Sequence, residues 1–393
     1  MTATDAAYLD YAATTPVDPR VAERMAGYLT ADGDFGNPAS ETHVFGRRAR
    51  AAVEAAREQV ATAIGADPRE VIFTSGATEA DNLALKGVAA FQRDRGRHIV
   101  TTAIEHKAVL DVCAALEFSG FEVTRVAPEP AGHIDPAAVR AALRDDTVLV
   151  SVMHANNETG VINDIAAIGE IVRAHGARFH VDAAQTVGKL PLDVSSLDVD
   201  LVSLSAHKIH GPKGIGALWV RRRPRVRLVS QMHGGGHERG LRSGTLPTHQ
   251  IVGMGEALRL AVAGRDEDAH HADSLRELLF ERLGSIDGLR HNGDGAPRLP
   301  GTRNIAFAGV EGEALASLLA DRLALATGSA CTSASVEPSY VLRAMGQGPA
   351  TAAEAVRLSW GRFTRTSEIE LAAAYLADAV ARLRGSGAAA ATA

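Results

Sequence analysis

Short β-rich runs alternate with stretches of helical periodicity from about Val71 to Val220, and this alternation limits the possible folds more than any other feature. Strands separated by helical stretches are typical of a mainly parallel sheet with helices on both faces. We therefore expect an α/β architecture whose binding site lies at the C-terminal ends of the strands. The expected strands cover residues 71–74, 99–103, 148–153, 179–182, 201–204 and 217–220.

The pattern changes after Pro247 to long amphipathic helical stretches at 251–263 and 274–283. Strand-like runs at 302–307 and 356–360 then alternate with helices, and a last helix is expected at 367–384. This pattern indicates a second, smaller α/β domain. We expect a large domain at 16–262 and a small domain formed by 1–15 and 263–384. The Gly, Ser and Ala tail at 385–393 has too little apolar bulk to pack, so we expect it to be disordered.

The amino-acid composition indicates how large a core the chain can bury and which kinds of partner it lacks signs of binding. With 393 residues, 46% of them hydrophobic, the chain can bury a large core in one enzyme-sized unit or two domains. The formal net charge of -6 gives no sign of direct nucleic-acid binding. The arginine-rich run at 221–227 is a local exception, for which a solvated loop is favoured over a docking patch for an acidic partner.

The two cysteines, Cys113 and Cys331, argue against a disulfide framework and for a reducing compartment. The first residues lack a signal-peptide pattern, and no apolar run approaches the ~18 residues of a membrane helix. We therefore expect a cytoplasmic protein without a membrane partner.

Lys208 and Asp182 each follow or end a strand-like apolar run. A lysine at the end of a buried strand is a candidate Schiff-base former, because desolvation favours the neutral, nucleophilic amine. An aspartate at a strand end can pair with a protonated pyridine nitrogen. Together the two residues predict a site for pyridoxal phosphate.

A phosphate cradle is expected at Gly76, Ala77 and Thr78, where a strand gives way to a helix expected at 80–90. Unpaired N–H groups and the helix dipole bind anions there. Alone this signal is weak, because a Ser/Thr-x-x-Glu capping box is commoner than a phosphate site.

Several separate motifs carry a family resemblance. They are LDYAATTP at 9–16, FGNPAS at 35–40, HGGGHE at 233–238, RSGT at 242–245 and GSACTS at 328–333. With them the chain resembles the pyridoxal phosphate-dependent cysteine desulfurases of iron-sulfur cluster assembly, in the class V aminotransferase family of fold type I. The resemblance implies conversion of L-cysteine to L-alanine, with the sulfur held on an enzyme cysteine as a persulfide. It also implies a homodimer and a sulfur-acceptor protein such as an iron-sulfur scaffold.

The resemblance also implies roles for individual residues. Lys208 would hold the cofactor covalently, Asp182 would pair with the pyridine nitrogen, and His106 would stack on the ring and help to move a proton. Gln185 would reach the ring hydroxyl. The phosphate would be bound by Thr78, Ser205 and His207, with Thr245 from the partner subunit, and the substrate carboxylate by Asn157 and Arg357. Taken singly, an arginine at a strand edge is more often in a surface ion pair, and a lone histidine is more often structural.

Cys331 decides which reaction such a cofactor would run. It lies in the small-residue stretch 327–335, which is typical of a mobile loop, and we expect it to be the nucleophile. Cys113, flanked by apolar residues in a helical stretch, is expected in the core. His233 and His237 are spaced as in zinc helices, but three intervening glycines and the lack of a third ligand favour a structural loop, so we expect no metal.

Rival interpretations stay open at this point. A pyridoxal phosphate aminotransferase or lyase of the same fold would share Lys208 and Asp182 but would have no use for Cys331. A selenocysteine lyase would share nearly everything, whereas a non-catalytic binding protein would need none of these residues. Family members often carry a longer C-terminal docking segment, so the acceptor is open between cluster assembly, tRNA thiolation, cofactor synthesis and DNA sulfur modification.

Overall fold

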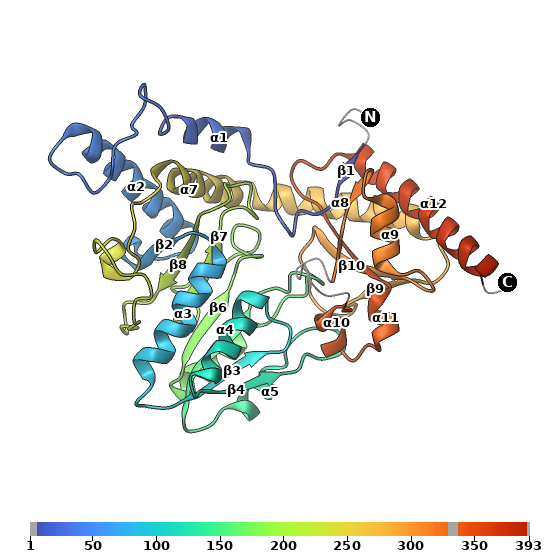
Figure 1. Cartoon of the computed structure of the whole chain (residues 1–393), viewed down its shortest axis with the longest axis horizontal. Helices are drawn as coiled ribbons and strands as arrows, with labels where there is room; N and C mark the ends of the chain where they lie inside the picture. Colours follow the sequence, from blue (N-terminus) through green and yellow to red (C-terminus); the bar gives the residue numbers. More distant parts are fainter. Residues whose placement is uncertain (1–5, 329–336, 391–393) are drawn as a thin grey trace.

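A seven-stranded sheet forms the centre of the larger part of the molecule (Figure 1). The computed structural model describes residues 6–328 and 337–390. The strand order is β2-β8-β7-β6-β5-β3-β4; the five strands from β7 to β4 are parallel, and β8 runs antiparallel to both neighbours. The expected mainly parallel sheet is confirmed. Its strands are β2 (Val71–Thr74), β3 (His98–Thr102), β4 (Glu122–Val126), β5 (Thr147–Met153), β6 (Arg178–Asp182), β7 (Leu201–Ser205) and β8 (Gly216–Val220).

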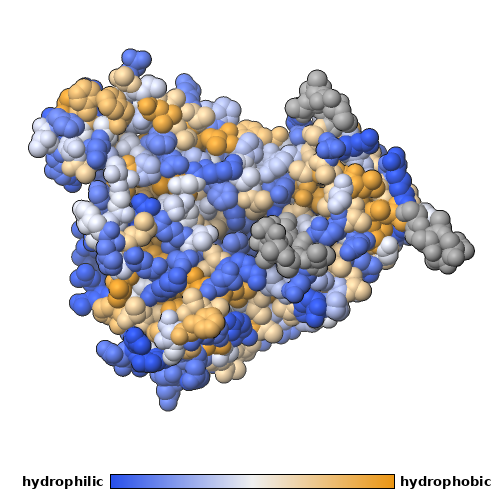
Figure 2. Space-filling view, viewed as in Figure 1, coloured by the Kyte–Doolittle hydropathy of each residue, from blue (hydrophilic) through white to orange (hydrophobic). Residues whose placement is uncertain are grey.

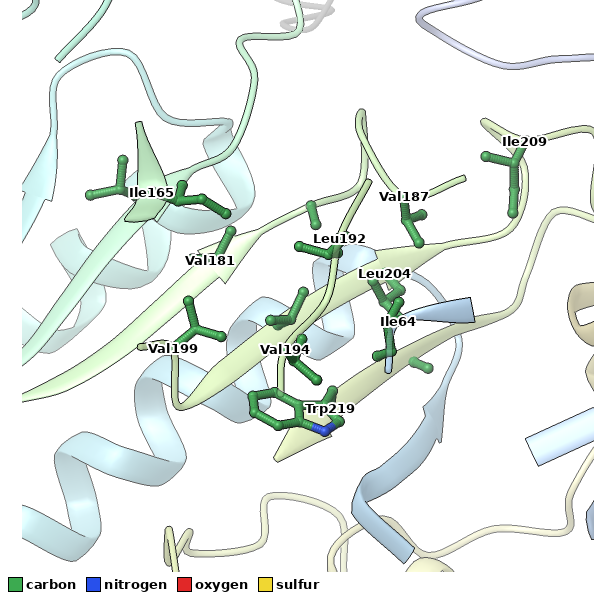
Figure 3. Packing of buried hydrophobic residues seen from close by; sticks show 14 of the residues in the cluster. Ile64, Ile165, Val181, Val187, Leu192, Val194, Val199, Leu204, Ile209 and Trp219 are labelled. Carbon is green, nitrogen blue, oxygen red and sulfur yellow. The ribbon is translucent and has the colours of Figure 1, made fainter. Parts of the chain in front are cut away.

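Helices cover both faces of this sheet because successive strand residues point to opposite sides. Leu218 of β8 belongs to a core cluster with α3 and α4, whereas its neighbour Trp219 belongs to a cluster with α2, α6 and α7. Figure 3 shows part of the second cluster, with Val181, Leu204 and Trp219 from three neighbouring strands. The helices are α1 (Pro19–Ala26), α2 (Val44–Ala63), α3 (Ala77–Gln92), α4 (Lys107–Phe118), α5 (Pro136–Ala142), α6 (Ile165–His175) and α7 (Thr248–Ala263).

The smaller part is built on an antiparallel sheet of order β12-β13-β10-β9. Its core includes Leu9, Leu275, Phe307 and Leu376, so the first described residues pack with the C-terminal third of the chain. The elements are β1 (Ala7–Tyr8), α8 (Arg265–Leu283), β9 (Leu289–Asn292), β10 (Thr302–Phe307), α9 (Gly312–Leu319), β11 (Leu323–Ala324), β12 (Ala326–Thr327), α10 (Tyr340–Ala344), α11 (Pro349–Ala353), β13 (Ala355–Ser359) and α12 (Thr366–Ala390). Strand β1 pairs in parallel with β11. The exact domain limits remain a prediction, because Val341 and Leu342 of α10 join the core of the larger part.

The tail was predicted wrongly over most of its length. Helix α12 continues to Ala390, so residues 385–390 are helical rather than disordered, and residues 391–393 lie outside the described part. The alanines at 388–390 favour this continuation, since alanine has the highest helix propensity, and they act against Gly385 and Gly387, which disfavour a helix. Within the described residues, no helix combines the length and apolar character needed to cross a membrane.

Exposed apolar side chains gather near the start of α2. Leu29, Phe35, Val44 and Phe45 are each more than two-fifths exposed, and Figure 2 shows hydrophobic surface over this end of the molecule. The Phe35 and Phe45 rings lie 5.7 Å apart between centroids.

Candidate active site

Asp182 and Lys208 lie at the C-terminal ends of adjacent parallel strands. Asp182 is the last residue of β6, Lys208 follows the end of β7, and the two strands pair in register with Asp182 opposite Ser203. The Asp182 side chain is buried, and its Oδ1 accepts a hydrogen bond of 2.8 Å from the Ala184 N–H. The carboxylate is therefore held in one orientation at the edge where ligands bind in sheets of this kind.

His106 lies within the electrostatic field of the other predicted groups. Burial lowers its pKa, the charge of Lys208 lowers it further, and the charges of Asp182 and Arg357 also act on it. Charges act on a buried group more strongly than on an exposed one, because the interior screens them less than water does. Lys208, Asp182 and Arg357, from three separate segments, therefore lie within electrostatic range of His106.

The His106 ring is also fixed by its position at the start of α4. Its Nδ1 accepts a hydrogen bond of 3.1 Å from the Ala108 N–H, as an N-cap side chain does. In the neutral ring the proton is then on Nε2. This nitrogen is the one available to donate or accept a proton in the site.

Four buried polar atoms of the candidate residues have no hydrogen-bond partner among the described residues: Gln185 Oε1, Ser205 Oγ, Asn157 Oδ1 and Arg357 Nε. Most buried polar atoms in folded proteins are hydrogen-bonded, so such a group indicates a ligand. Gln185 is held from its other side, where Nε2 donates to Ala12 O at 3.0 Å. The missing hydrogen-bond partners could be supplied by the ring hydroxyl and phosphate of pyridoxal phosphate and by the carboxylate of a substrate. The residues therefore fit pyridoxal phosphate and an amino acid.

The start of α3 has the features of a phosphate cradle. Gly76 is the N-cap residue, no side chain caps the helix, and a Cβ atom added at Gly76 would meet nothing within 4 Å. Glu79 accepts from the Ser75 N–H at 2.7 Å and pairs with Arg242, so it does not bond to the N–H of the N-cap residue as in a capping box. The N–H groups at this end are left open to an anion, and Thr78 is exposed beside them.

His207 lies on the lysine-bearing turn, where its Nδ1 is 3.1 Å from Thr14 Oγ1. Burial and the charges of Lys208 and Lys213 together lower the pKa of His207 to about 4. The ring is therefore neutral at physiological pH and would bind a phosphate as a hydrogen-bond donor rather than as a cation.

Arg357 reaches from β13 of the smaller part to the larger part. Its Nη1 donates to Asn157 O at 2.8 Å, and its Nη2 pairs with Asp10 Oδ1 at 2.7 Å. The side chain is buried, unlike that of a surface ion pair, and its Nε has no partner in the described residues. Arg357 and Asn157 therefore meet where the two parts of the molecule join.

Comparison with known proteins identifies the family. The Aminotransferase class-V family matches residues 7–371. "Cysteine desulfurase IscS" of Vibrio vulnificus strain YJ016 is 59% identical over 377 residues, which cover 96% of this chain and 93% of that protein. The chain therefore belongs to the cysteine desulfurases of the class V aminotransferase family. Like the rest of this group, this desulfurase is a pyridoxal phosphate-dependent enzyme.

Solved structures agree with that assignment. A "NIFS-LIKE PROTEIN" superposes on the desulfurase with a TM-score of 0.88 at 37% identity, covering 96% of this chain and 99% of that one. The structure named "SspA in complex with cysteine" gives a TM-score of 0.80 at 38% identity, covering 91% and 100%. The fold type I prediction is confirmed by these neighbours.

The sequence missed several ionisable groups of the desulfurase site. Glu105 precedes His106, and burial raises its pKa to about 8. Desolvation and the charges of Lys208 and Arg357 together lower the pKa of Lys189 to about 8. Asp10 was part of a recognised motif, but nothing in the sequence pointed to its ion pair with Arg357. For Lys189, the signal available in the sequence was its position four residues after the predicted site residue Gln185.

Not every predicted residue takes part in this group. Thr245 is exposed in the segment before α7, and its predicted contact with the partner subunit's cofactor stays a prediction. Cys331 lies outside the described residues. Cys113 is fully buried, and burial raises the pKa of its thiol to about 12. In the described ranges 6–328 and 337–390, no three His, Cys, Asp or Glu side chains cluster as metal ligands; His237 Nδ1 accepts from the Gly244 N–H.

Proposed function

We propose that this desulfurase transfers sulfur from L-cysteine to Cys331 and then to an acceptor protein of iron-sulfur cluster assembly. The observation that carries the proposal is the meeting of Lys208, Asp182, His106 and Arg357 beside buried polar atoms that lack partners. The names of the most similar relatives support the same reaction.

Pyridoxal phosphate, when bound, withdraws electrons from the substrate α-carbon and weakens the bond between the β-carbon and sulfur. Lys208 would hold the cofactor and move the α-proton. Asp182, oriented by the Ala184 N–H, would keep the proton on the pyridine nitrogen. His106, whose Nδ1 is occupied, would stack on the ring and exchange a proton through Nε2.

The remaining residues would bind and orient. Arg357 and Asn157 would hold the substrate carboxylate, since a guanidinium can offer two parallel N–H groups to a carboxylate. Gln185 would reach the ring hydroxyl. The phosphate would lie between the start of α3, at Gly76, Ala77 and Thr78, and the turn with Ser205 and His207, with the partner subunit's Thr245 completing the site.

The sulfur-transfer step balances without an added oxidant. The Cys331 thiolate attacks the substrate sulfur, an S–S bond forms, and the bond from sulfur to the β-carbon breaks. The electron pair of the broken bond stays on the carbon fragment, which takes up a proton and leaves as L-alanine. The enzyme then holds a Cys331 persulfide.

The deciding experiment is exposure of the purified holoenzyme to L-cysteine, with mass spectrometry of the cysteine peptides and measurement of alanine. We expect one added sulfur atom on the Cys331 peptide as alanine appears. Cys331→Ser should keep the cofactor absorbance and form no persulfide, whereas Cys113→Ser is the matched control and should behave as the parent. Alanine or pyruvate without sulfur on Cys331 would instead make the chain a lyase.

The acceptor is tested separately. The persulfide enzyme, labelled with radioactive sulfur from cysteine, is mixed with an iron-sulfur scaffold protein or with a tRNA-thiolation relay protein. We expect rapid label transfer to the scaffold. Transfer to the relay alone would reassign the acceptor while leaving the desulfurase reaction in place. We place the reaction in the reducing cytoplasm, which suits the free Cys113 thiol.

A further inference from the structure

Gly328 and Ser339 flank the stretch 329–336 in the chain, and they lie in direct contact. A Cβ atom built on Gly328 would be 2.4 Å from the Ser339 Cβ. Ser339 is buried and begins α10, where its hydroxyl accepts a hydrogen bond of 3.2 Å from the Leu342 N–H. The two described ends of the Cys331-containing stretch therefore meet at one side chain.

Ser339 is also bonded to the larger part of the molecule. Its Oγ donates to Glu158 Oε2 at 2.5 Å, and Glu158 is 5% exposed. Burial raises the pKa of Glu158 to about 7 against the smaller, opposing effects of the Ser339 hydrogen bond and the charge of Arg357. A buried carboxyl group is costly unless it is hydrogen-bonded, so the bond to Ser339 is one that the fold must keep.

Glu158, the partner of Ser339 in this hydrogen bond, lies on a rigid turn. Asn156 Oδ1 accepts from the N–H groups of Glu158 and Thr159, both at 2.9 Å, and Asn156 Nδ2 donates to Ile104 O at 2.9 Å. Asn157, between them, accepts from Arg357 through its carbonyl oxygen. Glu158 is thus one residue away from the proposed carboxylate-binding Asn157, on a turn with little freedom to move.

We propose that Glu158 is a positioning residue for sulfur transfer. Through Ser339 it ties Gly328 and the start of α10, which lie on either side of residues 329–336 in the chain, to the turn that contains Asn157. The inference rests on the proposed function, because it takes Cys331 as the sulfur acceptor. Neither Glu158 nor Ser339 is assigned a contact with substrate or cofactor. Small displacements between reacting groups reduce rates strongly, so loss of this bond should slow the transfer step in particular.

The test separates substrate binding from sulfur transfer in the holoenzyme. Ser339→Ala removes the bond to Glu158. We expect the cofactor absorbance and the spectral titration with L-cysteine to stay within about twofold of the parent, while the single-turnover rate of persulfide formation on Cys331 falls by about tenfold. Ser339→Thr keeps a hydroxyl and should restore most of the rate. Ser119→Ala removes an exposed hydroxyl bonded to Ala115 O and is the control, with the parent rate expected.

Glu158→Gln distinguishes the bond from the helix cap, because it leaves the Ser339 cap of α10 in place. Its neutral amide oxygen is a weaker acceptor, so we expect a fall of roughly threefold in the persulfide rate at unchanged cysteine affinity. This variant also decides the matter if Ser339→Ala does not fold. Parent-like persulfide rates in these variants, or an equal loss of cysteine binding, would overturn the proposal. Failure of the parent to load Cys331 would instead overturn the proposed function.

Discussion

At the scale of single residues, the site depends on buried polar groups that are held by one partner and left open on another side. Gln185 is bonded to Ala12 O and Arg357 to Asn157 O and Asp10, while Gln185 Oε1 and Arg357 Nε have no partner within residues 6–328 and 337–390. A side chain fixed in this way loses little conformational freedom when a ligand binds. The arrangement favours tight, oriented binding.

Arg357→Lys should raise the KM for L-cysteine by about tenfold or more, because an ammonium cannot offer the planar pair of N–H groups that binds a carboxylate. The cofactor absorbance should be unchanged. Alanine production against cysteine concentration measures the effect. Arg173→Lys, in an exposed pair with Asp198, is the control and should keep the parent KM. An unchanged KM for Arg357→Lys would remove its role in carboxylate binding.

Glu105 should make stability depend on pH. Burial raises its pKa from 4.5 to about 8, so between these values the folded state keeps a proton that the unfolded state has released. The free energy of unfolding therefore falls as pH rises through this window, by about 1.4 kcal/mol per pH unit from this group. Glu105→Gln should reduce that fall, measured as urea midpoints at pH 5, 6.5 and 8.

Glu117→Gln is the control for this pH experiment. The hydrogen bond from Arg125 lowers the pKa of Glu117, so its carboxylate is ionised in both states from pH 5 to 8. The slope should then match that of the parent. A parent-like slope in Glu105→Gln would mean that the buried carboxyl is already ionised at pH 5.

The site residues that the sequence predicted differ from those it missed in how far away their partners lie in the sequence. Asp182 and Lys208 were expected because each ends or follows an apolar strand, and the structure places them on adjacent strands. The ion pair of Asp10 with Arg357 spans 347 positions, and the bond of Glu158 with Ser339 spans 181. Local patterns contain no information on such contacts, which exist only once the sheet and both domains have formed.

At the scale of elements, the start of α3 should determine affinity for the cofactor phosphate. Gly76 has a φ of +156°, outside the range that side chains readily adopt, and faces open space. Gly76→Ala should raise the dissociation constant for pyridoxal phosphate by roughly tenfold, through strain and a methyl group in the cradle. Fluorescence titration of the cofactor-free enzyme measures this constant.

Gly348→Ala is the matched control for this variant. Gly348 begins α11 with a φ of -64° and also faces open space, so an added methyl group causes neither strain nor a clash. It should bind the cofactor as the parent does. Equal affinities for both glycine variants would exclude the start of α3 from phosphate binding.

Among the elements, buried strands were predictable and the exposed edge strand β4 was not. Strands β5 to β8 are buried on nearly every residue because helices cover both faces of the sheet, and all four were expected. Strand β4 lies at the sheet edge, and of its five residues only Val126 is buried, so no apolar run marks it in the sequence. Helix α12 was expected to end at 384 because the Gly, Ser and Ala residues that follow have little apolar bulk to pack, yet residues 385–390 continue as helix.

At the scale of the whole molecule, the site joins two parts of the chain and is proposed to need a second copy. Thr245 is exposed in its own chain, as a residue that completes a partner's site must be. Light scattering after size-exclusion chromatography should give a mass about twice the 41.1 kDa of one chain. A fully active species of single-chain mass would contradict the homodimer.

The burial of Cys113 bears on how much sulfur each subunit can hold at one time. Its thiol lies in the layer formed by α3, α4 and the sheet, and the chain has two cysteines. Reaching Cys113 would require that layer to open, so under the proposed function Cys331 is the one cysteine of a folded chain that takes up sulfur. Each subunit would then have to pass its sulfur to the acceptor before it could react with a second cysteine. The rate of sulfur supply would therefore depend on the acceptor as much as on the amount of cysteine.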